Sequence, residues 1–270
     1  MQRIIDSHCH IYPDSIALKA VKSIDRFYDG LPCEHHDGTC KCLVRTGNAA
    51  GISHFIVHSV ATTPEQVSSI NHFIAKSVLE SNGAMTGLGT MHLESSDHKA
   101  DIHEIIKLGL KGVKMHPDFQ RFHADDPKAM SIYALCEEYG LPVLIHTGDY
   151  RYDFSNPDRI ANVLRTFPRL KMIGAHFAGW SVWEEAAEKL PQYPNLIVDT
   201  CSSLHWLKPE RTKELINLYG ADRVLFATDY PIWPQRNEID YLLSLELPEE
   251  DYEKIFWKNT SNLFNIRIDT

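Results

Sequence analysis

Two histidines one residue apart near the start of the chain, His8 and His10, are the first residues whose types and spacing could do chemistry. Side chains alternate along a strand, so the two imidazoles point the same way if this segment is extended. Paired imidazoles of this kind can bind a divalent transition metal. Because the chain contains 15 histidines, this spacing alone is weak support for a metal site.

Three later apolar runs also end in residues that bind metals, namely His146, His176 and Asp229. Imidazoles from His8, His10 and His146 together with the Asp229 carboxylate suit one divalent ion, for which zinc is favoured and manganese, iron or cobalt are alternatives. The open coordination position would hold water, which becomes a nucleophile near neutral pH, or a substrate oxygen. Other roles remain open: His146 could cap a loop, His176 could be a packed core residue, and Asp229 could begin a helix.

The elements that must position these residues alternate between short apolar runs and longer helical patterns, which is typical of βα units and a parallel sheet. Helices are expected over 63–81 and 127–139. The eight expected strands are 3–8, 53–58, 85–90, 111–116, 142–146, 171–176, 196–200 and 223–228. We therefore predict an α/β fold, a single (β/α)8 TIM barrel domain over residues 1–270, with an open doubly wound sheet as the alternative. In such a barrel, chemistry is expected at the carboxyl ends of the strands.

Composition excludes several classes of protein. The formal charge of −9 comes with scattered lysines and arginines, so no basic stripe for nucleic acid is present. No apolar stretch approaches the roughly 18 residues of a membrane span, and the chain starts without a signal-type layout. Six cysteines are too few for a disulfide scaffold and are expected to be reduced. We expect a cytoplasmic protein whose partner is a small-molecule substrate, and we leave a homo-oligomer open.

One irregular insertion, residues 29–47 in the first βα region, is rich in Cys, His, Gly and Asp. Its segment Cys33–Cys42 holds three thiols and two imidazoles, enough for a second, structural zinc ion, although the spacing matches no standard zinc finger. The alternative is a polar lid over the barrel mouth in which the cysteines are incidental.

Several motifs together resemble the amidohydrolase superfamily, and within it the amidohydrolase-related group that includes aminocarboxymuconate-semialdehyde decarboxylase. They span nearly the whole chain in that family's order and are Asp6-Ser-His-Cys-His10, Gly112-Val-Lys-Met-His-Pro117, Ile145-His-Thr-Gly148, Gly174-Ala-His176, Thr228-Asp-Tyr-Pro231 and the closing Asn262-Leu-Phe264. The resemblance implies that His8, His10, His146 and Asp229 bind one divalent metal and that His176 is the neighbouring acid–base group. We accordingly place His176 and Asp229 in the catalytic set.

Other branches of this superfamily use a carboxylated lysine on the fourth strand to bridge two metals. Lys114 lies on that strand, but inside Val-Lys-Met-His rather than at its end, so a mononuclear site is favoured and a second metal stays an alternative. A lysine in an apolar strand is costly unless paired, so Lys114 is expected to meet a carboxylate of the protein or of a substrate. The residues expected to bind substrate are Lys114, His116, Arg121, Arg151, Trp180 and Trp233. The alternatives are a structural salt bridge for Lys114, a contact that holds a loop for His116, solvated loops for the two arginines and core packing for the two tryptophans.

The leading functional hypothesis is a metal-dependent hydrolase in which activated water attacks a small carboxylate-bearing ester, lactone or amide and His176 relays the proton. The alternative is a non-oxidative decarboxylase of an unsaturated or aromatic acid that uses the same metal site. A hydratase and a barrel that only binds a ligand are further alternatives.

Overall fold

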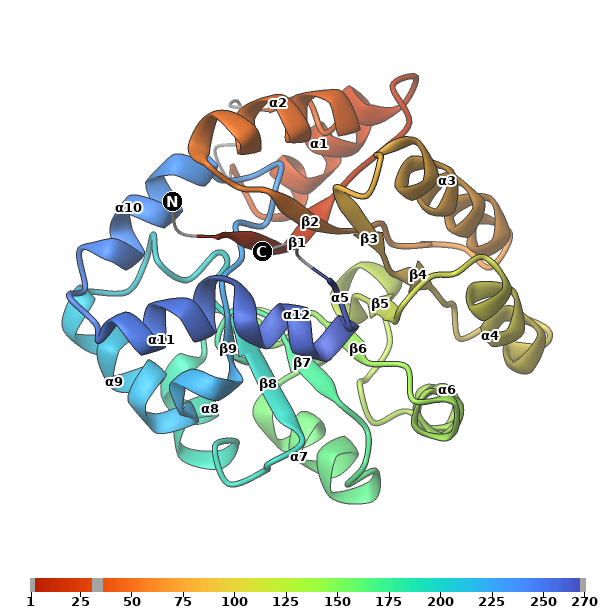
Figure 1. Ribbon diagram of the computed structural model, residues 1–270. Helices are drawn as coiled ribbons and strands as arrows, with labels where there is room; N and C mark the ends of the chain where they lie inside the picture. Colours follow the sequence, from red (N-terminus) through yellow and green to blue (C-terminus); the bar gives the residue numbers. More distant parts are fainter. Residues whose placement is uncertain (1–2, 31–35, 268–270) are drawn as a thin grey trace.

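The computed structural model describes residues 3–30 and 36–267, which form a closed barrel of parallel strands (Figure 1). The strands are β1 (Ile5–His10), β2 (His54–His58), β3 (Met85–Gly87), β4 (Gly89–Thr90), β5 (Val113–Met115), β6 (Val143–Ile145), β7 (Met172–Gly174), β8 (Leu196–Asp199) and β9 (Val224–Leu225). Every neighbouring pair is parallel, in the orders β1-β2-β3 and β4-β5-β6-β7-β8-β9.

The third predicted strand is divided at Leu88 into β3 and β4. The N–H of Leu88 still donates to the carbonyl of Val57 at 2.9 Å, whereas the next N–H, of Gly89, donates to the carbonyl of Gly112 at 2.9 Å. Residues 85–90 therefore act as one strand of the barrel and join the two sheets. Closure comes from the N–H of Ser7, which donates to the carbonyl of Phe226 at 3.0 Å. The (β/α)8 barrel is confirmed, and the open sheet is wrong.

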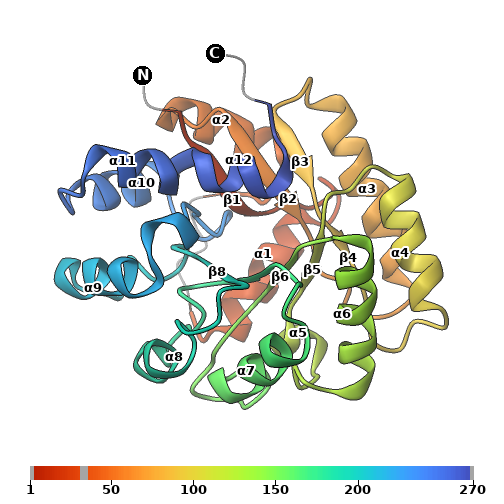
Figure 2. The same ribbon diagram turned by 60° about the horizontal axis from the view of Figure 1, so that its bottom comes forward.

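The helices surround the barrel and cover its two ends (Figures 1 and 2). They are α1 (Ala17–Phe27), α2 (Cys40–Ala50), α3 (Gln66–Glu80), α4 (His98–Lys107), α5 (Pro117–Gln120), α6 (Pro127–Tyr139), α7 (Pro157–Thr166), α8 (Trp183–Lys189), α9 (Pro209–Tyr219), α10 (Gln235–Leu243), α11 (Glu249–Glu253) and α12 (Asn259–Phe264), with a 3-10 turn at Ala221–Arg223 and a π-helical turn at Lys254–Lys258. Helix α6 has the predicted bounds because Asp126 caps its start with its side chain and Gly140 ends it at φ 66°.

Apolar side chains inside the barrel fix which residues face its mouth. The strands contribute a buried interior cluster that includes Ile5, Ile56, Leu88, Leu144, Ile173 and Leu225, and Phe264 of α12 closes it from the amino-terminal end. Because side chains alternate along a strand, His58 lies on the same face as Ile56, and His146 lies on the same face as Leu144. The carboxyl ends of the strands therefore present imidazoles above an apolar floor.

Strand β1 departs from this alternation through an irregularity. Its register against β2 shifts between Asp6 and Cys9, and Cys9 belongs to the outer core between strands and helices. Ile5, His8 and His10 consequently all point inward although they do not share one parity. Asp6 has the same parity as the two histidines, yet its carboxylate accepts the N–H of Thr228 at 3.0 Å.

The predicted insertion over 29–47 is irregular only in part. Helix α2 begins at Cys40, where the Thr39 side chain accepts a hydrogen bond from the N–H of Cys42 at 3.1 Å. Cys33 lies outside the described residues, so the second zinc ion stays a prediction. In the described parts of the chain, the candidate metal groups include neither Cys40 nor Cys42. In residues 3–30 and 36–267, no helix combines the length and apolar character needed to cross a membrane.

Candidate metal centre and active site

Three predicted metal ligands meet at the carboxyl end of the barrel. Nε2 of His8 lies 3.2 Å from Nε2 of His10, and both atoms lie 3.5 Å from Oδ1 of Asp229. With metal–ligand bonds of about 2.1 Å, donors around one ion are separated by roughly 3.0 to 3.4 Å. The first separation lies in this range and the other two exceed it by about 0.1 Å, so the three side chains are candidate ligands of a single divalent metal.

The ring of His8 is oriented by an aspartate. Nδ1 of His8 lies 2.8 Å from Oδ2 of Asp199, the last residue of β8, and both side chains are fully buried. An imidazole that donates from Nδ1 to a carboxylate presents its Nε2 lone pair to a metal. Asp199 thus performs an orienting role that sequence reasoning missed, although a carboxylate at the end of a predicted strand is a signal that could have found it.

A buried ammonium faces the same lone pair. Nζ of Lys114 lies 3.1 Å from Nε2 of His8. Burial lowers the pKa of Lys114 to about 8, although the carboxylates of Asp229 and Asp199 act in the opposite direction. The charged side chain therefore lies at the metal centre and lines the pocket above it.

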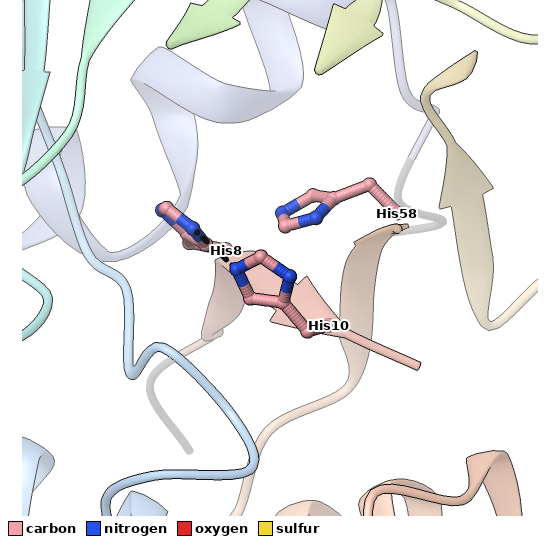
Figure 3. Close-up of side chains that lie close together, drawn as sticks. All are labelled: His8, His10 and His58. Atoms are coloured by element: carbon pink, nitrogen blue, oxygen red, sulfur yellow. Dashed lines mark hydrogen bonds between the residues drawn. The ribbon is translucent and has the colours of Figure 1, made fainter. Parts of the chain in front are cut away.

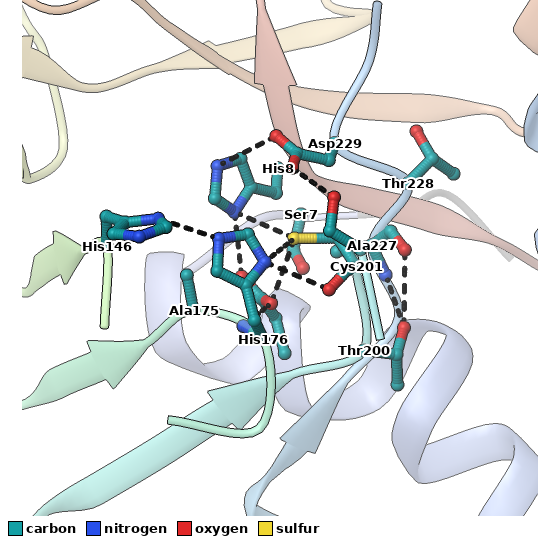
Figure 4. A network of polar contacts seen from close by, with 12 residues as sticks. Ser7, His8, His146, Ala175, His176, Thr200, Cys201, Ala227, Thr228 and Asp229 are labelled. Atoms are coloured by element: carbon teal, nitrogen blue, oxygen red, sulfur yellow. Dashed lines mark hydrogen bonds and ion pairs between the residues drawn. The ribbon is translucent and has the colours of Figure 1, made fainter. Parts of the chain in front are cut away.

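His146 and His176 form a pair beside these donors (Figure 4). Nδ1 of His146 lies 3.0 Å from Nε2 of His176. The other nitrogens face carbonyls, of Gly148 at 3.0 Å and of Cys201 at 2.9 Å, so each of them carries a hydrogen. If both rings were neutral, two lone pairs would face each other. A cation between the two rings would satisfy both lone pairs.

Left-handed backbone turns aim His176 and Asp229 into the pocket. The φ angles of His176, Phe177 and Ala178 are 62°, 51° and 59°, and that of Asp229 is 57°. Non-glycine residues in this region carry a local conformational cost that the surrounding structure must offset. The N–H of His176 donates to Oδ1 of Asp199 at 2.8 Å, so the carboxylate that orients His8 also supports the first of these turns.

Burial keeps the imidazoles of the centre neutral. It lowers the pKa of His10 to about 3 and lowers the pKa values of His8, His116 and His146 well below the usual range, with positive neighbours adding to the effect at each site. A neutral imidazole offers the lone pair that a metal needs. The electrostatics of the site are therefore those of a cation-binding centre.

The pocket above these residues is small and walled by apolar and aromatic side chains. Its lining comprises His8, His10, Ile24, Tyr28, Lys114, His116, Phe119, His146, His176, Asp229 and Ile232, around a cavity of about 20 Å³. A cavity of about 10 to 15 Å³ holds one water molecule. Helix α1 supplies Ile24. Tyr28, the residue after the end of α1, places its hydroxyl 3.2 Å from Nε2 of His116. Sequence reasoning missed Tyr28, since nothing in its local pattern indicates that it returns to the barrel mouth.

Of the other predicted substrate-binding residues, His116 lines the pocket, whereas Arg151 and Trp180 lie behind its wall. His116 is stacked on His146 with ring centroids 4.1 Å apart. Arg151 is held by the carboxylate of Asp149 at 2.8 Å and packs over Tyr28, whose ring also contacts Trp180. Neither Arg151 nor Trp180 is among the lining residues.

Trp233 and Arg121 are also outside the pocket lining. Nε1 of Trp233 donates to Oγ of Ser202 at 2.8 Å, and Ser202 in turn donates to Oδ2 of Asp229 at 2.5 Å. Trp233 therefore orients the Asp229 carboxylate through Ser202. Arg121 is exposed at the end of α5, with φ 56°.

Comparison with known proteins agrees with this architecture. A family model described as amidohydrolase matches residues 5–266. The chain belongs to the amidohydrolase family. The resemblance found in the sequence is thereby confirmed, and the protein is an enzyme of the amidohydrolase superfamily. Its donor groups are candidate metal sites built from histidine, aspartate and cysteine side chains.

Two curated relatives of this amidohydrolase are decarboxylases by name. The gamma-resorcylate decarboxylase of a Polaromonas strain is 32% identical over 116 residues, which cover 37% of this chain and 36% of the relative. The 2-amino-3-carboxymuconate-6-semialdehyde decarboxylase of Dictyostelium discoideum is 24% identical over 206 residues, which cover 60% of this chain and 55% of the relative. Both alignments span less than two thirds of the relative's length.

Solved structures share the fold across nearly the full chain. An uncharacterized TIM-barrel protein of Bordetella bronchiseptica superposes with a TM-score of 0.81 at 24% identity, covering 97% of this chain and 98% of its own. A dihydroxybenzoic acid decarboxylase of Polaromonas, solved with manganese and the inhibitor 2-nitroresorcinol, has a TM-score of 0.74 at 16% identity and covers 100% of this chain and 98% of its own. At these identities the likeness shows the fold alone.

Proposed function

We propose that this amidohydrolase is a metal-dependent, non-oxidative decarboxylase of a small aromatic or unsaturated carboxylic acid. One observation carries the proposal: a paired, buried imidazole, His176, lines a pocket together with the ammonium of Lys114, four apolar or aromatic side chains and three spaced metal donors. The names of both curated relatives support the same reaction. The hydrolase hypothesis, which the sequence ranked first, has less support.

The donors proposed to hold the metal are His8, His10 and Asp229, with His146 as a fourth, and zinc or manganese fits this set. When bound, the ion supplies Lewis acidity that stabilises negative charge on substrate oxygens. Lys114 adds a second positive charge on the same side of the pocket, where a carboxylate or phenolate oxygen can accept a hydrogen bond from Nζ.

The proposed role of His176 is to deliver a proton to carbon. The bond between the substrate ring and its carboxyl carbon breaks, the electron pair stays on the ring carbon, and carbon dioxide leaves. His176 donates the proton from Nε2 to that carbon, and the carbonyl of Cys201, 2.9 Å from Nδ1, holds the ring in place. A planar substrate is larger than the cavity in the structure, so its entry displaces Tyr28 and the end of α1 from the pocket mouth.

The test is product analysis on the metal-loaded protein. We would supply 2,6-dihydroxybenzoate, other hydroxybenzoates and muconate-type acids with a labelled carboxylate, and in parallel a panel of esters and lactones. The expected result is labelled carbon dioxide, with one solvent deuterium in the product at the vacated carbon in heavy water. Turnover confined to esters or lactones, with oxygen from solvent water in the product, would contradict the decarboxylase and favour the hydrolase.

Two variants connect the reaction to the site. His176→Asn should lower kcat by about 10² to 10⁴, the usual contribution of a positioned acid, while metal content stays unchanged. The exposed His72→Asn on α3 is the matched control and should retain wild-type activity.

A further inference from the structure

His58 is a buried imidazole at the metal centre to which neither the family motifs nor the reaction gives a role. It is the last residue of β2 and pairs in register with His10 on β1. It follows the inward-facing Ile56 by two residues, so its side chain also points into the barrel. None of its surface is exposed to solvent.

Both ring nitrogens of His58 lack a hydrogen-bond partner in residues 3–30 and 36–267. A buried donor or acceptor without a partner costs about 1 to 3 kcal/mol, so such groups need an explanation. The neighbouring imidazoles differ in this respect: both nitrogens of His146 and both nitrogens of His116 have partners. His58 therefore retains unused coordinating capacity beside the metal donors.

The three imidazole rings are arranged as if around one point (Figure 3). The ring centroids of His8 and His10 are 5.2 Å apart, and that of His58 lies 4.8 Å from His8 and 4.5 Å from His10, perpendicular or nearly so to both. Imidazoles bound to one ion through bonds of about 2.1 Å have centroids separated by roughly 4.6 to 5.3 Å. One ligand atom from each ring lies within 4.8 Å of the others.

We propose that His58 is a further imidazole ligand, in addition to His146, of the metal held by His8, His10 and Asp229. The proposal rests on the metal-binding part of the proposed function and not on the reaction. The donor atoms lie further apart than in a closed coordination sphere, so His58 shifts toward the ion when it binds. Because it has no hydrogen bonds to break among the described residues, that shift costs little.

The first measurement needs no variant. The full chain, labelled with ¹⁵N-histidine and loaded with ¹¹³Cd, should show a direct ¹¹³Cd–¹⁵N coupling at one nitrogen of His58, as well as at His8 and His10. The His58 signal would be assigned by its loss in His58→Asn. A His58 nitrogen without this coupling in the loaded wild-type protein would overturn the proposal.

The second measurement is metal affinity by chelator competition. His58→Asn should weaken binding at least tenfold. The matched control is His54→Asn on the same strand, where His54 bonds Thr86 at 2.9 Å away from the centre, and its affinity should stay within about twofold of wild type. Equal affinity of wild type and His58→Asn would overturn the proposal.

The outcomes also separate this inference from the proposed function. Metal bound through His8 and His10 without His58, with carbon dioxide release intact, would refute only the role of His58. Coupling at His58 in a protein that releases no carbon dioxide from any acid tested would support this inference while contradicting the decarboxylase. A chain that binds no divalent metal would overturn both.

Discussion

The Oδ2 atom of Asp199 lies 2.8 Å from Nδ1 of His8, and the other oxygen of the same carboxylate receives the N–H of His176 at 2.8 Å. One buried side chain thus orients a proposed metal donor and supports the turn that carries the proposed acid–base group. Such carboxylate–histidine contacts fix the ring tautomer and raise the basicity of the ligand nitrogen.

Asp199→Asn should weaken metal binding by about 10- to 100-fold, because the amide offers one acceptor oxygen in place of two and no longer raises the basicity of the His8 ring. Chelator competition with zinc or manganese would measure the affinity. The exposed Asp222→Asn is the matched control and should bind as wild type does. Unchanged affinity in Asp199→Asn would show that the contact is structural only.

Lys114→Met should bind the metal about tenfold or more tightly, because it removes a buried positive charge 3.1 Å from a ligand nitrogen of His8. The same variant should raise KM for the acid substrate, since an ammonium that can bond its oxygens is lost. Metal content per chain and initial rates would measure the two effects. Loss of metal in Lys114→Met would instead favour the alternative in which a carboxylated lysine bridges two ions.

The sequence predicted the barrel and many of the residues at the carboxyl ends of its strands for a physical reason. Strand-end histidines such as His146 follow buried apolar runs, and parallel strands in a barrel bring all such ends to one face. Contacts that depend on tertiary geometry could not be read in this way. The register shift in β1, the left-handed turn at His176 and the return of Tyr28 to the pocket each arise from packing between segments distant in sequence.

Arg151 illustrates the same limit. An arginine in a loop after a strand is well placed to bind a substrate carboxylate. The sequence does not indicate that the guanidinium of Arg151 instead forms an ion pair with Asp149, two residues earlier, at 2.8 Å. The structure instead uses Arg151 to hold the end of α1 against the barrel, since its Nη1 donates to the carbonyl of Phe27 at 2.7 Å.

Glu238 on α10 should make the protein less stable as pH rises. Burial raises the pKa of this carboxyl to about 8 from the ordinary 4.5, and its Oε2 has no partner among the described residues. Between these values the unfolded chain has released the proton that the folded chain keeps. The free energy of unfolding therefore falls with pH across this window, by up to about 1.4 kcal/mol per pH unit from this group.

Glu238→Gln should remove that contribution. We expect it to be more stable than wild type at pH 7.5, and we expect this advantage to shrink by up to about 3 kcal/mol at pH 5.5. Urea unfolding of both proteins at the two pH values would measure the difference, with the exposed Glu249→Gln as control. A difference between Glu238→Gln and wild type that does not vary with pH would contradict the raised pKa.

A side chain at Gly148 should destabilise the protein through a steric clash. Gly109 has nearly the same φ angle but open space around it, so it separates the clash from the cost of the backbone conformation. The two have φ angles of 78° and 76°, but a Cβ on Gly148 would lie 2.7 Å from the carbonyl carbon of Gly179 and 2.8 Å from the backbone of Trp180, whereas one on Gly109 meets nothing within 4 Å. Gly109→Ala should cost about 1 to 2 kcal/mol, the price of the left-handed conformation alone. Gly148→Ala should cost a further 1 to 3 kcal/mol from the clash with backbone that cannot move aside.

Gly148→Ala should also disturb the candidate metal centre, because the carbonyl of Gly148 accepts the hydrogen bond from Nε2 of His146 at 3.0 Å. Gly148→Ala should therefore lower metal affinity, while Gly109→Ala leaves it unchanged. Urea unfolding and chelator competition on the two variants would measure both effects. Equal losses of stability in the two variants would mean that the turn relaxes around the added methyl group. The close approach of the Gly148 and Gly179 backbones would then not be what holds His146 in place.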